Sequence, residues 1–433
     1  MKDYMRALIE IRKNGVKAGI PSFCTANEIV IEACLERGKS FDDCVLVEAT
    51  ANQVNQFGGY TGMRPADFRD FVFEIADRIG FSRDRIILGG DHLGPLTWSG
   101  LPEAEAMKNS VDLVKEFVSA GFKKIHLDTS MRVADDSRDE ILSTDVIARR
   151  GAVLYKACEE AYQELLKINP DETRPVFIIG SEVPIPGGAQ QEEDGISVTK
   201  PEALDETLAA YRRAFTAEGI PDAFDNVIGV VVQPGVEFGD NDVFVYNREN
   251  ASELTSCALG HSNIVLEGHS TDYQPAQALK EMVEDGVAIL KVGPALTFGL
   301  REGLFALDAM EKELVPLDRQ ADFKAVLENA MLKNPGNWVK HYHGTDEEIK
   351  IKRKFSYSDR CRYYLTQPEV VSAVEKLLSN MDSVTIPMGM LHQYMPVQYN
   401  KVRDGKLPSA SRELVKDFVG TFVDDYNYAV SVS

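Results

Sequence analysis

Positive charge is scarce in this 433-residue chain, where 47 lysines and arginines face 68 aspartates and glutamates and leave a formal net charge of −21. Nucleic acids and anionic membrane surfaces bind basic faces, so we expect neither as a partner. The six cysteines are scattered and form no C-x-x-C pair. That pattern argues against a disulfide framework and a structural zinc knot, and it is typical of a reducing compartment.

Long apolar stretches are also lacking. No run of about 18 apolar residues occurs, so nothing in the sequence predicts a membrane span. The first fifteen residues contain no apolar core of a secretory signal. Hydrophobic residues nevertheless make up 44% of the chain, enough for a large core. We therefore expect a cytoplasmic protein.

Short apolar runs occur eight times, each closed by a polar residue and followed by a helical pattern. Because the runs are continuous rather than alternating, they predict strands buried on both faces, as in a parallel sheet. The count of eight favours a (β/α)₈ (TIM) barrel over a doubly wound sheet, which has the same alternation. The runs are 19–24, 44–48, 85–91, 124–128, 176–182, 226–233, 263–269 and 287–291.

The last third of the chain has a different character. Beyond about residue 300, helical patterns dominate and no strand-rich core is evident. We expect a barrel domain over residues 1–300 and a helical extension over residues 301–433 that packs on the barrel. A basic stretch in the extension, residues 352–364, is the best candidate for holding a phosphate.

The polar residues that end the eight runs are the candidates for chemistry, because barrel enzymes place their sites at the carboxyl ends of the strands. Imidazole and carboxylate groups with an open position suit zinc or a similar divalent ion. We predict a metal site with His92 and His269, helped by Asp128, Glu182 or Gln233. The other five histidines, including His126, His261 and His392, are expected to be structural.

Two further groups are candidates for moving protons. Asp91 precedes His92 and either transfers a proton on a metal-held substrate or orients an imidazole. Glu192 and Glu193 lie in a long glycine-bearing loop after the fifth run. This loop has the composition of a closing lid that brings in a second acid or base, although acids in a loop are also often only solvated.

Candidate phosphate ligands gather in the basic stretch. Arginine offers a planar fork of donors and serine a hydroxyl, and both groups bind phosphate. Salt bridges on a helix surface are the alternative interpretation of the same residues. The predicted substrate-binding residues are Arg353, Ser356, Ser358, Arg360 and Arg362, together with Lys291 at the end of the eighth run.

Long motifs throughout the chain resemble the GatZ/KbaZ family, the class II D-tagatose-1,6-bisphosphate aldolase subunits. The resemblance extends from about residue 7 to beyond residue 400. It implies a barrel similar to that of the zinc-dependent class II aldolases. The motifs are LVEATANQVNQFGGYTGM, LGGDHLGP, KIHLDTSM, GSEVPIPGG, VVVQPGVEF, GHSTDYQ, LKVGPALTF, FSYSDRCRYY and IPMGMLHQYMPVQY.

The resemblance also assigns roles to several residues. It implies that Asp91 is an acid/base and that His92 and His269 bind metal. Asp128 corresponds to the aspartate of the fourth strand in those enzymes, and Glu182 corresponds to the glutamate of the fifth strand. Residues 192–195 correspond to the glutamate-bearing loop that follows the fifth strand. The chain departs from the aldolases at Gln233, where they carry a third metal-binding histidine. The resemblance to zinc-dependent aldolases implies zinc as the first expectation. Manganese, cobalt, nickel or magnesium are the alternatives, because a glutamine oxygen binds metal more weakly than an imidazole does.

The family leaves two functions open. One is a metal-dependent 4-epimerase that interconverts D-tagatose 6-phosphate and D-fructose 6-phosphate by retro-aldol and aldol steps, within tagatose or galactitol catabolism. The other is a non-catalytic subunit that a class II tagatose-bisphosphate aldolase requires for activity and stability. We favour the epimerase, because a support subunit needs neither a metal-and-base set nor a phosphate site. We expect a phosphorylated ketose as ligand, an aldolase catalytic subunit as a possible partner, and a homo-oligomer.

Overall fold

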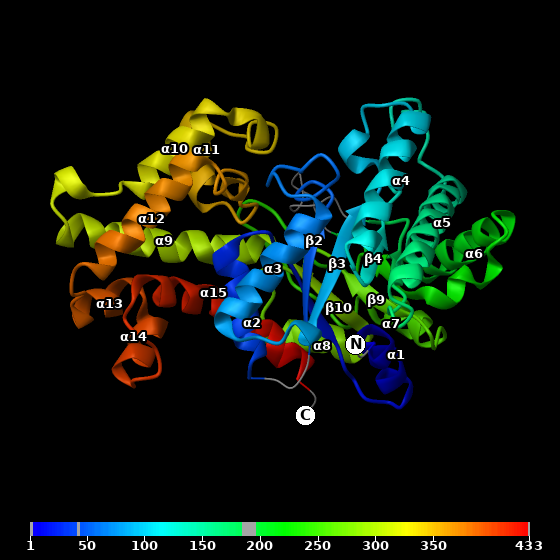
Figure 1. The fold of residues 1–433 in the computed structure, drawn as a ribbon, viewed down its shortest axis with the longest axis horizontal. Coiled ribbons are helices and arrows are strands. Elements are labelled where there is room, and N and C mark those ends of the chain that lie inside the picture. The colour runs from blue at the N-terminus through cyan, green and yellow to red at the C-terminus, as the bar shows by residue number, and fades with distance from the viewer. Residues whose placement is uncertain (1–2, 41–43, 184–195, 432–433) are drawn as a thin grey trace.

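A computed structural model describes residues 3–40, 44–183 and 196–431. Eight parallel strands form a closed barrel in which the last strand pairs with the first (Figure 1). Each predicted run forms one strand, so the predicted barrel is confirmed and the doubly wound sheet is excluded. The strands are β1 (Ile20–Cys24), β2 (Val45–Thr50), β3 (Ile86–Leu93), β4 (Lys124–Leu127), β5 (Val176–Ile179), β6 (Val227–Val232), β9 (Val265–Gly268) and β10 (Val287–Val292).

Helices follow the strands and cover the outside of the barrel (Figure 1). In α3, Pro65 occupies the first turn, Phe68, Val72 and Ile75 are buried, and Gly80 ends the helix with a φ of 72°. A proline that needs no N–H partner and a left-handed glycine are the usual limits of a helix. The covering helices are α2 (Glu28–Gly38), α3 (Pro65–Ile79), α4 (Glu103–Ser119), α5 (Thr144–Ile168), α6 (Pro201–Ala217), α7 (Ser252–Leu259) and α8 (Ala276–Asp285).

The amino-terminal end of the barrel is closed by α1 (Tyr4–Lys13). Met5, Leu8 and Ile9 of this helix belong to one apolar cluster with side chains of the barrel strands, such as Ile20 and Ile87. This end of the barrel is therefore sealed by hydrophobic packing. Polar side chains collect instead at the opposite, carboxyl ends of the strands, where ligands bind in barrels.

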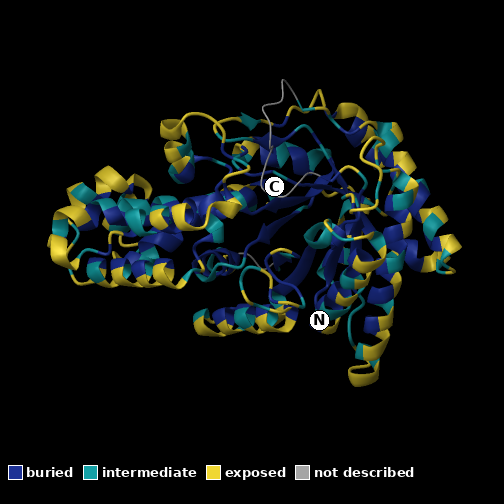
Figure 2. Cartoon of the chain, turned by 90° about the horizontal axis from the view of Figure 1, so that it is seen from above, coloured by how far each residue is buried: buried dark blue, intermediate teal, exposed yellow. Residues whose placement is uncertain are grey.

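The carboxyl-terminal region is helical and returns to the barrel. After α9 (Pro294–Leu314) the chain builds a lobe beside the barrel, and α15 (Ser411–Val430) then packs against α2, α8 and α9 (Figures 1 and 2). Thus α15 closes the helical layer between α8 and α2. The predicted boundary at residue 300 lies inside α9. The lobe contains α10 (Phe323–Lys333), α11 (Asp346–Phe355), α12 (Pro368–Asp382), α13 (Met388–Tyr394) and α14 (Pro396–Arg403).

The remaining elements are short. A two-stranded antiparallel sheet of β7 (Glu237–Phe238) and β8 (Val243–Phe244) follows β6. Across the described residues, no helix combines the length and apolar character that crossing a membrane requires. The 3₁₀ helices are η1 (Arg83–Arg85), η2 (Pro95–Trp98), η3 (Pro221–Asn226), η4 (Leu317–Arg319), η5 (Pro335–Asn337) and η6 (Arg360–Tyr363).

Candidate functional site

Three histidines from different strands face one another at the carboxyl end of the barrel. His92 lies near the end of β3, His126 in β4 and His269 directly after β9, and their ring centroids are 5.0–5.2 Å apart. Because β9 is separated from β4 by two strands, the barrel curvature is what brings His269 to the other two rings. All three side chains are buried.

The end of β3 departs from a regular strand. The pairing register with β4 shifts between Gly90 and Leu93, and His92 has a φ of 48°, in the left-handed region. Neighbouring residues of a regular strand point to opposite faces, whereas this irregularity lets the side chains of Asp91 and His92 both reach the histidine cluster.

Each histidine is held by a carboxylate. Nδ1 of His92 lies 2.7 Å from Oδ2 of Asp128, and Nδ1 of His126 lies 2.8 Å from Oδ1 of Asp91. Nε2 of His269 lies 2.9 Å from Oε1 of Glu267. A carboxylate that accepts from one ring nitrogen fixes the imidazole tautomer and its orientation, as it does around metal ions.

The other ring nitrogens are available as ligands. Nε2 of His126 and Nδ1 of His269 are buried and have no hydrogen-bond partner among the described residues. Nδ1 of His126 lies 3.2 Å from the backbone nitrogen of His92 as well as 2.8 Å from Asp91: it accepts the backbone N–H when unprotonated and donates to the carboxylate when protonated. Buried polar atoms without partners are costly, and a bound cation would satisfy them.

The protonation states suit metal ligation. Burial lowers the pKa of His126 to about 4 and the pKa of His269 to about 3, so both imidazoles are neutral near pH 7. Burial alone would raise the pKa of Asp128, but the hydrogen bond with His92 lowers it. Neutral imidazoles beside an ionised carboxylate are the forms that metal sites require.

Asp91 links the histidines to Lys291. The Nζ of Lys291, at the end of β10, donates to Oδ2 of Asp91, while Oδ1 faces His126. Burial lowers the pKa of Lys291. Lys291 lines the adjacent pocket, and Asp91 lies behind it, fully buried.

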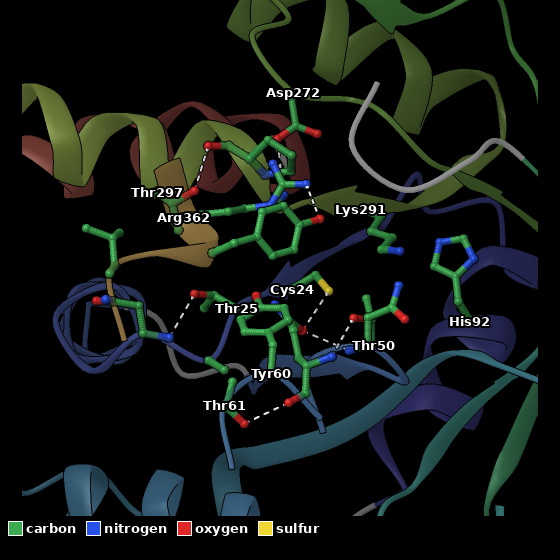
Figure 3. A pocket seen from close by; sticks show the side chains of 18 of the residues that line it. Cys24, Thr25, Thr50, Tyr60, Thr61, His92, Asp272, Lys291, Thr297 and Arg362 are labelled. Carbon is green, nitrogen blue, oxygen red and sulfur yellow. Dashed lines mark hydrogen bonds between the residues drawn. The ribbon is translucent and has the colours of Figure 1, made fainter. Parts of the chain in front are cut away.

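A pocket opens beside His92 and His269 and extends to the carboxyl-terminal region (Figure 3). The pocket is partly open to solvent. Threonine, asparagine, glutamine and tyrosine side chains from β1, β2 and the following loops supply hydrogen-bonding groups, suited to sugar hydroxyls. They are Thr25, Asn27, Thr50, Asn52, Gln53, Tyr60 and Thr61.

Arg362 supplies a positive charge to the pocket wall. Its guanidinium donates to the carbonyl of Asp359 at 2.9 Å and to the hydroxyl of Tyr363 at 3.0 Å. Burial would lower the pKa of Arg362, but Tyr363, Tyr60 and Asp359 raise it, so the side chain stays charged. Among the described residues that line the pocket, the lysine and arginine side chains are Lys291 and Arg362.

Asp272 lies in the same wall. Its Oδ1 accepts the backbone N–H groups of Gly293 and Ala295 at the start of α9, at 3.1 and 2.7 Å. Burial raises the pKa of Asp272 to about 6. The carboxyl thus occupies the helix N-terminus, a position that commonly binds anions.

The remaining predicted metal and acid/base residues lie elsewhere. Glu182 accepts the hydroxyl of Thr199 at 2.7 Å, away from the histidine cluster. Gln233 uses its side-chain oxygen to accept the backbone N–H groups after it, both at 2.9 Å. Glu192 and Glu193 lie outside the described residues.

The basic stretch contributes Arg362 and Tyr363 to the pocket lining, and Arg362 is its only predicted phosphate ligand there. Arg353 pairs with Glu328 and Arg360 donates to the carbonyl of Asn337. The hydroxyl of Ser356 donates to Asp240 at 2.6 Å. Arg353, Ser356, Ser358 and Arg360 do not line the pocket.

Sequence reasoning missed His126 and Glu267. Each stands two residues before a predicted metal ligand: His126 before Asp128, and Glu267 before His269. Side chains two apart on a strand share a face. That spacing was a signal for both residues. Asp272 lies in a loop, and no comparable pattern pointed to it.

Comparisons with known proteins agree over nearly the full chain. The model of the family described as "D-tagatose-1,6-bisphosphate aldolase subunit GatZ/KbaZ-like" matches residues 5–431. A solved structure described as a probable tagatose 6 phosphate kinase from Sinorhizobium meliloti 1021 is 44% identical, with a TM-score of 0.86. That comparison covers 95% of this chain and 100% of the other.

Two solved aldolases are more distant. The YdjI aldolase from Escherichia coli K12 is 11% identical, with a TM-score of 0.40 and coverage of 87% of this chain and 97% of that one. The fructose-bisphosphate aldolase from Campylobacter jejuni is 15% identical, with a TM-score of 0.43 and coverage of 86% and 90%. At this distance neither protein informs the activity of this chain.

Proposed function

Because the chain belongs to the GatZ/KbaZ-like family of D-tagatose-1,6-bisphosphate aldolase subunits, we propose that it is a metal-dependent 4-epimerase of ketohexose 6-phosphates. Its substrates would be D-tagatose 6-phosphate and D-fructose 6-phosphate, interconverted by retro-aldol and aldol steps. The observation that carries the proposal is the cluster of three carboxylate-held histidines beside a pocket whose wall contains a charged arginine. A subunit that only supports a partner requires neither feature.

The donor set fits a divalent cation. Nε2 of His126 and Nδ1 of His269 have no hydrogen-bond partner among the described residues, Nε2 of His92 lies 3.5 Å from Oδ2 of Asp91, and imidazoles suit zinc. Potential ligand atoms of Asp91, His126, Glu267 and His269 all lie within 4.8 Å of one another. Asp128 would orient His92 rather than bind the ion. Bound there, the cation would supply Lewis-acid stabilisation of the negative charge that develops on the sugar when the C3–C4 bond opens.

Asp91 and Lys291 would move the proton. Lys291 faces the pocket and Asp91 contacts its ammonium group from behind. As Asp91 accepts a proton from this ammonium group, the lysine takes the proton of the C4 hydroxyl. The C3–C4 bond then opens, C4 becomes an aldehyde carbon, and C3 retains the electron pair. A lysine whose pKa is lowered by burial passes a proton on more readily.

Inversion requires both fragments to stay in the pocket. The aldehyde turns about the C4–C5 bond and presents its other face, C3 attacks again, and the C4 oxygen recovers the proton from Lys291, which is reprotonated by Asp91. Arg362 would hold the phosphate of the aldehyde fragment throughout.

The direct test uses the purified chain alone. Fructose 6-phosphate is incubated with the protein and zinc, manganese, cobalt, nickel or magnesium, and proton NMR follows the appearance of tagatose 6-phosphate. We expect epimerisation with at least one metal, and its loss together with bound metal in His92→Ala and His269→Ala. Absence of product with all five metals would reject the epimerase.

The same preparation tests the support-subunit alternative. The chain is added to a class II tagatose-bisphosphate aldolase catalytic subunit, and bisphosphate cleavage is measured. Activation of that partner by a wild-type chain that epimerises nothing would establish the alternative. Activation that persists in His92→Ala would further separate it from metal chemistry in this chain.

A further inference from the structure

A row of buried charged side chains lies beneath the histidine cluster, inside the barrel. The Nζ of Lys124 in β4 lies 2.8 Å from Oε1 of Glu48 in β2 and 2.8 Å from Oε2 of Glu267 in β9, and all three side chains are 0% exposed. The other oxygen of Glu267 is the one that faces Nε2 of His269, at 2.9 Å. The row therefore runs from Glu48 through Lys124 and Glu267 to a histidine of the cluster.

The neighbouring strand leaves room for this row. A Cβ added to Gly89 in β3 would lie 2.3 Å from Oε1 of Glu48, so a side chain there would displace the carboxylate. Two carboxylates and one ammonium group carry one net negative charge. Burying these groups costs desolvation energy, and apolar residues of similar size would fill the barrel at least as well without that cost. A contribution to stability alone therefore does not account for the row.

We propose that Glu267, held in place by Lys124 and Glu48, is a positioning residue that fixes His269 as the Nε2–H tautomer and presents its Nδ1 to the pocket as a metal ligand. This inference rests on the proposed function, because it assigns a role relative to the metal site. Oε1 of Glu267 faces Nε2 of His269, and Oε2 forms an ion pair with Lys124 that lacks hydrogen-bond geometry. We therefore assign Glu267 to orienting the ligand rather than to binding the ion. The net negative charge of the row strengthens the binding of a cation above it.

The bonding of His269 supports this assignment. Nε2 already has an acceptor, whereas Nδ1 is buried and has no hydrogen-bond partner among the described residues. An imidazole that donates from Nε2 has its lone pair on Nδ1. Lys124 in turn keeps Glu267 from being an isolated buried carboxylate, which would be strongly unfavourable.

The first test needs no metal. In the metal-free protein labelled with ¹⁵N-histidine, long-range ¹H–¹⁵N correlations report which ring nitrogen of His269 carries the proton, and His269→Gln assigns its signals. We expect the Nε2–H tautomer in the wild type and a mixture of tautomers in Glu267→Leu. A proton on Nδ1 in the wild type would overturn the inference, whether or not the protein proves to be an epimerase.

The second test measures metal affinity by calorimetry with zinc alone. Glu267→Gln should weaken binding roughly 10–100-fold, the usual effect of removing the partner of a ligating histidine. Glu48→Gln, which leaves the contact with His269 intact but removes the net charge, should weaken it by a smaller factor. The control Glu311→Gln removes a fully buried carboxylate that accepts the N–H of Ala321, outside the site, and should leave affinity unchanged.

The outcomes separate this inference from the proposed function. Wild-type affinity in both Glu267→Gln and Glu48→Gln would overturn the positioning role even if the enzyme epimerises sugars. If Glu267→Gln does not fold, the zinc affinity of Glu48→Gln decides the question. Wild-type affinity in Glu48→Gln would then overturn the role of the charged row. A wild-type protein with the Nε2–H tautomer but no metal binding would support the orientation of His269 and reject the proposed metal-dependent enzyme.

Discussion

Substituting Arg362 by methionine tests the phosphate site most sharply, because the same segment supplies a matched control. Arg362 lines the pocket, and its guanidinium donates to the Asp359 carbonyl and the Tyr363 hydroxyl. A bound phosphate would replace these neutral acceptors with charged ones. Arg360, two residues earlier, is buried, whereas Arg362 is half-buried, and Arg360 donates to the Asn337 carbonyl and to His341, away from the pocket. Arg360→Met therefore controls for the loss of an arginine from this segment.

The expected loss follows from the kind of bond. A hydrogen bond to a charged group contributes about 1.5–3 kcal/mol. Arg362→Met should thus weaken the binding of fructose 6-phosphate by roughly 10- to 150-fold. Fructose, which lacks the phosphate, should bind Arg362→Met and the wild type alike. Calorimetry with both sugars on the wild type, Arg362→Met and Arg360→Met measures the coupling between the arginine and the phosphate.

Two results would refute this assignment. If Arg362→Met weakens fructose and fructose 6-phosphate by the same factor, the arginine maintains the pocket and does not bind phosphate. If Arg360→Met causes the same selective loss as Arg362→Met, the effect comes from disorder of the whole segment. Thermal unfolding of both variants, measured beside the wild type, shows how much each arginine contributes to the fold.

Three further predictions concern other parts of the site. Asp91→Asn should lower the epimerisation rate by ~10²–10⁴-fold with little change in metal content, because the amide cannot accept the proton; rate and metal content measured together check this. Asp272 has a pKa raised to about 6 against about 3.9 unfolded, so its contribution to stability is present below pH 4 and is lost as the pH rises through 6. Urea unfolding should therefore show the wild type losing up to about 3 kcal/mol relative to Asp272→Asn between pH 4 and pH 7, and parallel curves would contradict it. Gly94→Ala should destabilise the protein by roughly 1–3 kcal/mol or more, because its Cβ would lie 1.7 Å from the carbonyl oxygen of Asp128. The Cβ of the control Gly100→Ala meets nothing within 4 Å, and thermal unfolding of both variants checks the difference.

Much of the site could be predicted because strand ends are readable in sequence. His92 and His269 were identified since a polar residue that closes a buried run of a barrel must lie at its functional end. The motifs likewise identified the family, which the match over residues 5–431 confirms. Glu182 and Gln233 also end runs, yet each side chain bonds to a nearby loop residue. Position at a strand end restricts where a residue lies but not where its side chain points.

Local periodicity in the sequence predicts the number of strands, their burial on both faces and the helical character of the last third. The meeting of His126 with His92 and His269 comes from tertiary packing, since it depends on how strands from distant parts of the chain meet across a closed barrel. The same holds for Arg362, which reaches the pocket only because the carboxyl-terminal region folds back over the barrel mouth. Contacts between residues far apart in sequence leave no periodic signal, and packing alone selects them.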